Sequence, residues 1–171
     1  MACDKAITFF ESLEIKYVFS LQIFLFQKAL ACLQLKRYDE GKEHIVRCID
    51  MYTVKSGNWF WHTHAYVLLC FHSGDYQQAQ SIFEEVSAAE GFGELATQHA
   101  KESWKIVEAY LYYLNTTYRT EIQTQRNFRV TKFINEVPEF SKDKRVTNIP
   151  ILIVQILLLL HAAKKNPSKT G

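Results

Sequence analysis

Glycine and proline are scarce in this chain of 171 residues, which contains six of the former and three of the latter. Both residues interrupt helices and build tight turns, so their scarcity argues against the closely spaced turns of an all-β fold. Hydrophobic residues make up 48% of the chain and charged residues 22%, a balance typical of folded domains and not of disordered ones. The composition therefore predicts an all-α protein.

A strong excess of one charge is also lacking, because the formal net charge is only +2. Proteins that bind nucleic acid normally show a basic stripe and a larger positive excess. A basic cluster at residues 119–145 interleaves seven basic side chains with four acidic ones. A solvated face or loop is favoured there over a phosphate-binding surface. We expect no nucleic-acid partner.

The four cysteines lack the CxxC spacing of metal and redox motifs. Cys3, Cys32, Cys48 and Cys70 lie in apolar helical surroundings, which favours buried, reduced thiols over disulfides. The N-terminus shows no cationic segment followed by an apolar one, so no signal peptide is predicted. Both features favour a cytoplasmic location.

The longest apolar run, Ile149–Leu160, is too short to span a membrane, which takes about 20 residues. A buried helix is therefore preferred, and no membrane partner is expected. Because apolar residues cover every face of this helix, it has to lie between neighbouring helices or in a subunit interface. We predict self-association through Ile149–Leu160, since such a surface is unfavourable in water.

Two segments of the chain, residues 24–49 and 61–86, share one pattern at a constant offset of 38 residues. Each has an apolar helix, a short polar turn and a second helix. The matched pairs are Cys32 and Cys70, Tyr38 and Tyr76, Gly41 and Ala79, and Ile45 and Phe83.

This pattern resembles the tetratricopeptide repeat family, in which small residues let paired helices approach and large ones fill the gap between hairpins. The first segment has Ala29, Tyr38, Gly41, Ile45 and Cys48 at the family's positions. The second has Tyr76, Ala79 and Phe83, but Val67 and Val86 stand where small residues are expected. The resemblance implies a right-handed superhelix of antiparallel helix hairpins, although the period of 38 exceeds the usual 34 or so. The alternative is two generic helical hairpins in a bundle.

We predict a single repeat domain over residues 1–163, followed by a polar tail, 164–171. Its units are residues 21–52, 59–88 and a degenerate third, 97–137, with a last helix at 148–163. In the third unit, a helix over Thr97–Asn115 precedes one that starts near Thr120 or Arg126 and ends at Pro138. A short helix over Asp4–Glu14 comes first. The last third resembles uncharacterised bacterial helical-repeat proteins, and the chain is interpreted as a fragment of a longer protein.

The resemblance also implies a binding face, because the first helices of tetratricopeptide hairpins line a concave groove that commonly receives a peptide. A lysine–asparagine clamp for a peptide carboxylate is not expected, since Phe26 and Leu30 stand at those positions. The alternative is that the lining residues are buried against an adjacent helix. The predicted lining consists of Phe26, Gln27, Leu30, Gln34, His64, Leu68, His72, Tyr110 and Tyr113.

No complete catalytic or metal-binding motif is present. His62 and His64 lie two residues apart on a predicted helix and point about 200° apart, so they cannot chelate one ion. His64 and His72 share a face but lack a third ligand, and the histidines are interpreted as surface or groove residues.

Neither a nucleophile elbow nor a Gly-rich phosphate loop occurs. A cysteine–histidine pair stays open from the residues alone. We expect no catalytic residue, metal or cofactor.

These observations favour a non-catalytic scaffold that binds a protein or peptide partner of unknown identity. The alternative is a ligand- or peptide-sensing regulatory region of a larger protein, such as a transcriptional regulator.

Overall fold

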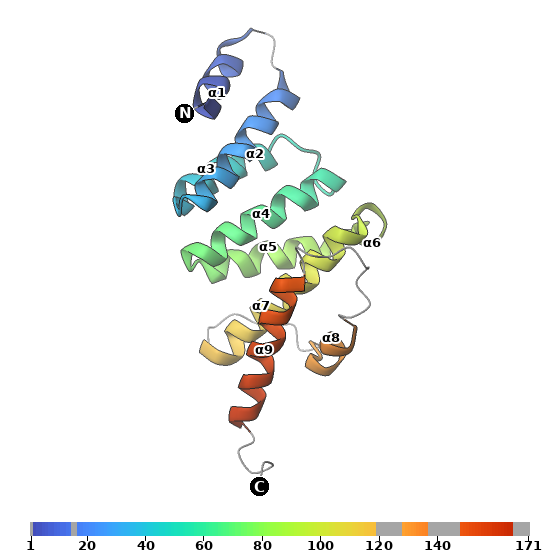
Figure 1. Cartoon of the computed structure of the whole chain (residues 1–171). Helices are drawn as coiled ribbons and strands as arrows, with labels where there is room; N and C mark the ends of the chain where they lie inside the picture. The colour runs from blue at the N-terminus through green and yellow to red at the C-terminus, as the bar shows by residue number, and fades with distance from the viewer. Residues whose placement is uncertain (1, 15–16, 119–127, 137–147, 166–171) are drawn as a thin grey trace. The chain divides into compact units, whose positions relative to one another are not determined.

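The computed structural model describes residues 2–14, 17–118, 128–136 and 148–165, and every regular element within them is a helix (Figure 1). The predicted all-α class is confirmed. The chain forms two compact units, Met1–Ala100 and Lys101–Gly171, and each is considered by itself. The single domain over 1–163 stays a prediction.

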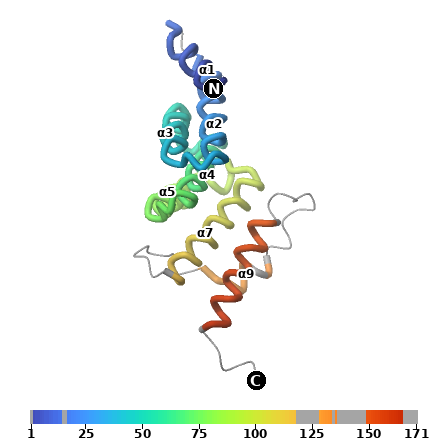
Figure 2. Tube along the Cα trace, turned by 60° about the vertical axis from the view of Figure 1, so that its left-hand side comes forward, coloured from blue at the N-terminus to red at the C-terminus, as the bar shows by residue number. Residues whose placement is uncertain are grey.

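The N-terminal unit is a series of helices in which each of α1 to α5 packs against the next. Its longer helices are joined by short connections, so sequence neighbours run antiparallel and α2 and α4 run in the same direction. The α3 helix packs against both α2 and α4, which also touch each other (Figure 2). The helices are α1 (Ala2–Ser12), α2 (Val18–Gln34), α3 (Tyr38–Ile49), α4 (Gly57–Ser73), α5 (Tyr76–Ala88) and the short α6 (Phe92–Leu95). The sequence did not predict α6.

The α2–α3 and α4–α5 hairpins close with the same turn. Lys36 and Gly74, 38 residues apart, both have left-handed backbone conformations, with φ of 59° and 78°. One residue later, the amide of Arg37 donates to the Cys32 carbonyl (2.8 Å) and that of Asp75 to the Cys70 carbonyl (2.9 Å). The 38-residue correspondence of the side chains therefore extends to the backbone of the turns.

The α3 helix approaches both α2 and α4 closely at Gly41. A Cβ atom added there would lie 2.7 Å from Cδ2 of Leu69 and 3.1 Å from Cβ of Cys32. Both neighbours are buried, as are Ile45 and Ala29 in the same cluster. The small residue predicted for this position is thus required by the packing.

The N-terminal helix α1 packs on α2 and contributes Ile7 to a buried cluster with Leu25 and Cys48. Phe10 stacks on Phe24 with ring centroids 5.7 Å apart. The prediction of a helix over Asp4–Glu14 was two residues too late at both ends.

The second unit is built from α7 (Gln98–Tyr118), α8 (Val130–Glu136) and α9 (Asn148–Lys165), except that the first three residues of α7 belong to the N-terminal unit. The predicted first helix was too short, since α7 runs to Tyr118, and Thr97 caps it by accepting a hydrogen bond from the Ala100 amide (3.1 Å). A helix that runs from near Thr120 or Arg126 to Val137 was wrong for either start, because Phe128 and Arg129 are not helical and α8 begins at Val130. Residues 119–127, the predicted helix end and loop at 137–147, and the tail from 166 lie outside the described residues.

The apolar helix α9 is buried on one side only. Ile151, Val154 and Leu158 pack with Ile106 and Phe133 in one cluster, while most large side chains on the other side are exposed. Of the two expected arrangements, burial between neighbouring helices therefore holds for only one side of α9 among the described residues, and burial in a subunit interface stays a prediction. No helix among the described residues combines the length and the apolar character needed to cross a bilayer.

We predict that Gly41→Ala lowers the free energy of unfolding by about 1 kcal/mol, although alanine favours helices, because the added methyl group overpacks the contact between the helices. Chemical denaturation followed by circular dichroism measures the change. Gly93→Ala is the matched control, because no atom lies within 4 Å of a Cβ added at Gly93. This variant should be as stable as wild type or more so. Equal stability of Gly41→Ala and wild type would contradict the packing argument.

Candidate functional site

The predicted binding residues of the first two hairpins lie on α2 and α4, which contact each other in the N-terminal unit. Gln27, Gln34 and His72 are exposed, whereas Phe26, Leu30, His64 and Leu68 are partly buried. Spacings of three and four residues place each set on one side of its helix. The structure therefore brings these seven residues to one face, here called the α2–α4 face.

Tyr110 and Tyr113, the other two predicted residues, lie on α7 and pack within the second unit. Both contact its buried cluster. The Tyr110 hydroxyl donates to the Pro150 carbonyl at 3.3 Å, and the Tyr113 ring meets His161 edge-on at 6.3 Å. They are partly buried, and they serve to hold α9 against α7.

The prediction missed Ile23 and Trp61, which extend the α2–α4 face by one turn toward the start of each helix. Ile23 is 42% exposed and Trp61 is 40% exposed. They are separated by 38 residues, as are Phe26 and His64. The register of the repeat, continued one turn earlier, would have identified both.

The Trp61 ring contacts two imidazole rings. It stacks on His64 with centroids 6.3 Å apart and planes at 25°, and it meets His99 at 5.4 Å and 40°. His99 follows Trp61 by a further 38 residues. The Trp61 ring, at one end of the α2–α4 face, is therefore in contact with both imidazoles.

Desolvation lowers the pKa of His64 to about 4, and the nearby charge of His99 adds to the shift. The imidazole is therefore neutral at physiological pH. As a neutral ring it stacks on Trp61 without bringing a charge to the face.

Phe26, a residue of the α2–α4 face, packs inward against the buried His62. Its ring meets His62 edge-on at 4.4 Å, and Tyr52 covers His62 from another side at 4.6 Å. His62 Nδ1 lies 2.7 Å from the Asn58 carbonyl, to which it must donate, so Nε2 is left to accept from the Tyr52 hydroxyl at 3.4 Å. Burial lowers the pKa of His62. The interpretation of this histidine as a surface or groove residue was wrong.

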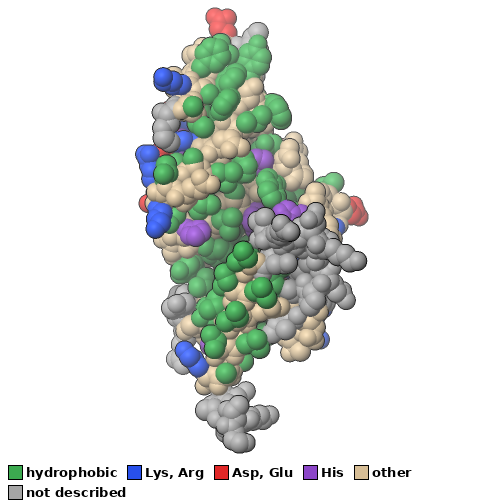
Figure 3. Space-filling model, in the orientation of Figure 1, with side chains coloured by type: hydrophobic (Ala, Val, Ile, Leu, Met, Phe, Trp, Pro, Cys, Tyr) green, Lys and Arg blue, Asp and Glu red, His purple; other side chains and the backbone are tan. Residues whose placement is uncertain are grey.

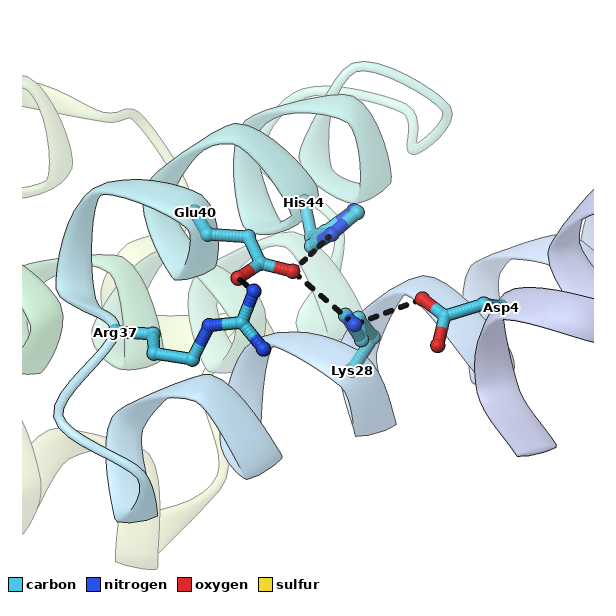
Figure 4. A network of polar contacts seen from close by, with 5 residues as sticks. All are labelled: Asp4, Lys28, Arg37, Glu40 and His44. Carbon is cyan, nitrogen blue, oxygen red and sulfur yellow. Dashed lines mark hydrogen bonds and ion pairs between the residues drawn. The ribbon is translucent and has the colours of Figure 1, made fainter. Parts of the chain in front are cut away.

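Only one lysine, arginine, aspartate or glutamate occurs in α2 and α4 together, namely Lys28. Its side chain is 4% exposed and its ammonium lies 2.7 Å from Asp4 of α1 and 3.1 Å from Glu40 of α3 (Figure 4). Glu40 also pairs with Arg37 and lies 3.8 Å from His44. Hydrogen bonds to the carboxylates, foremost that of Asp4, raise the pKa of Lys28. The single charge of the two helices is therefore neutralised within the fold.

The buried cysteines are unsuited to nucleophilic chemistry. Cys32, Cys48 and Cys70 are buried and all four cysteines are free, as predicted except that Cys3 is only partly buried. Desolvation raises the pKa of Cys48 to about 11 and that of Cys70 to about 12, which leaves both thiols protonated. Among the described residues, no three histidine, cysteine, aspartate or glutamate side chains are grouped so that they could hold a metal ion.

No protein-family model matches this chain, and neither the curated proteins nor the solved structures contain a significant match.

We predict that Lys28→Met weakens the dependence of stability on acid. The hydrogen bond from Lys28 lowers the pKa of both Asp4 and Glu40, so the wild-type fold should lose stability as pH falls from about 5 to 2 and these carboxylates take up protons. Thermal melts across that range measure the slope. Lys5→Met removes an exposed lysine of α1 and should keep the wild-type slope of stability against pH. The same slope in Lys28→Met would contradict the role of Lys28 in lowering the two carboxyl pKa values.

We also predict that the His64 imidazole titrates near pH 4 when followed by NMR on the folded chain. The unfolded chain binds this proton near pH 6.5, so between those values only the unfolded state is protonated. Stability should therefore fall as pH drops from about 6.5 toward 4, and His64→Gln should reduce that loss. A titration midpoint at or above 6 would contradict the burial of the ring.

Proposed function

We propose that this chain is a non-catalytic interaction module with a tetratricopeptide-like arrangement of helix hairpins, and that its α2–α4 face binds an apolar or amphipathic segment of a partner protein. The observation that carries the proposal is that Ile23 and Trp61 are about 40% exposed on a face to which neither helix contributes a formal charge.

The repeat-like arrangement is supported by the residues between the two hairpins. Tyr38, which follows the first turn, stacks on His72 of α4 with centroids 5.7 Å apart and packs against the cluster that contains Ile45 and Leu69. This is the gap-filling role that the resemblance assigns to an aromatic residue after the turn. The matching turns and the close approach at Gly41 agree with it.

The chemistry of the face favours an apolar partner. A carboxylate or phosphate would find no cation from α2 or α4, because Lys28 is buried in ion pairs. Trp61 offers a large, rigid ring that loses little conformational entropy when a partner covers it. Tryptophan is for this reason common among the central residues of protein interfaces. A helix with apolar residues at spacings of three and four suits two parallel helices that display such side chains.

Selection of peptides from a random library displayed on phage, with the full chain immobilised, tests the proposal. We expect enriched peptides to carry apolar residues at helical spacing and to bind Trp61→Glu and Leu68→Glu at least tenfold more weakly, because each change places a carboxylate in an apolar contact. Val54→Glu alters an equally apolar, exposed residue of the loop before α4 and should bind like wild type.

The affinities are measured by fluorescence anisotropy, with circular dichroism to show that each variant is folded. Phe26→Glu is less informative, because Phe26 also packs on the buried His62. Undiminished binding to folded Trp61→Glu and Leu68→Glu would exclude the α2–α4 face.

A further inference from the structure

A second apolar surface lies on α9 of the second unit. Hydrophobic side chains gather along this helix in the lower part of Figure 3. They form a row of six large residues, each 46–62% exposed, here called the α9 seam: Ile149, Leu152, Ile153, Ile156, Leu159 and Leu160. The other side of α9 is buried against α7 and α8. Within the part of the chain that the structure describes, the seam is therefore the exposed side of a helix that is otherwise held in place.

The spacing of the seam suits a second helix. Ile149 and Ile156 are seven residues apart, and the remaining members fall three and four residues after each of them. This is a repeat of 3.5 residues, which keeps one stripe of a helix facing a partner helix. No lysine, arginine, aspartate or glutamate occurs between residues 149 and 163, so a partner must bring an apolar surface of its own.

We infer that the α9 seam pairs with the α9 seam of a second copy of this chain, in an antiparallel dimer whose two-fold axis passes near Ile156. A second copy supplies the required surface, since a two-fold interface uses the same patch on both subunits.

The order of residues along the seam supports the antiparallel direction. Around Ile156 the pattern is symmetric, because Leu152 and Leu160 lie four residues away on either side and Ile153 and Leu159 lie three away. Antiparallel pairing sets Ile149 opposite the exposed Ala163 at both ends of the interface. A large residue then meets a small one at each end, and the distance between the helices stays constant.

A parallel pair would bring two isoleucines together at one end and two alanines at the other, which makes the helices diverge. It would also align the two helix dipoles side by side and place both Lys164 side chains together. The antiparallel pair avoids both effects.

The extent of the seam is sufficient for a stable but moderate dimer. Six half-exposed aliphatic side chains on each copy bury on the order of 1,000 Å² in total, near the lower limit of specific interfaces. A membrane surface is a poorer occupant, because helices that lie on membranes carry basic residues on the opposite face, and here that face is packed against α7.

Sedimentation velocity of the full chain from about 1 to 100 μM tests the dimer. We expect a monomer–dimer equilibrium in wild type. In Ile156→Glu the dissociation constant of the dimer should rise about a hundredfold or more, because the dimer would bury two carboxylates at the axis. Val54→Glu makes a like change at an aliphatic residue that is 59% exposed and should associate like wild type. A wild-type monomer at every concentration would overturn the inference, and so would unchanged association of Ile156→Glu.

Disulfide trapping tests the direction independently of any effect on folding. In a Cys3→Ser background, where the remaining native thiols are buried, Ile156→Cys should form a covalent dimer under mild oxidation. Ala163→Cys alone should not, but a mixture of Ile149→Cys and Ala163→Cys chains should. Self-linking of Ala163→Cys as efficient as that of Ile156→Cys would overturn the antiparallel arrangement.

Discussion

The close approach of α3 to both α2 and α4 is the contact on which the N-terminal unit depends. At Gly41 the absence of a side chain lets Leu69 and Cys32 occupy the space that a methyl group would need. This proximity holds α2 and α4 parallel at the distance at which they touch, and it is the reason that Ile23 and Trp61 belong to one surface. A wider separation would leave two unconnected helices in place of a face.

The two hairpins and their turns could be predicted from the sequence, because residues 24–49 and 61–86 show the same pattern at an offset of 38 residues. Outside the repeat, the long helices α7 and α9 were still found from their apolar residues, but two short elements were not. The start of α8 at Val130 lacks a capping residue that would mark it, and α6 is a single turn that begins after Gly91 in the left-handed conformation. Lys36 occupies a left-handed position usually marked by glycine, so its backbone conformation was not evident either.

The candidate site was predicted in part for the same reason. Mapping from the repeat found Leu30 and Leu68 but stopped one turn short of Ile23 and Trp61. The burial of His62 depends on Tyr52 from the α3–α4 connection, and the neutralisation of Lys28 depends on Asp4, 24 residues earlier. Such contacts arise from tertiary packing, and no local pattern along a helix contains them.

The placement of Lys28 also determines how a partner would meet the α2–α4 face. With its one formal charge buried in ion pairs and His64 neutral, the pair of helices creates little electric field to draw in or repel an approaching molecule. Encounter would then proceed at the ordinary rate for unsteered docking, roughly 10⁵–10⁶ M⁻¹s⁻¹, and added salt would change it little. Selectivity on such a surface rests on shape and on the time a complex lasts, and much less on long-range attraction.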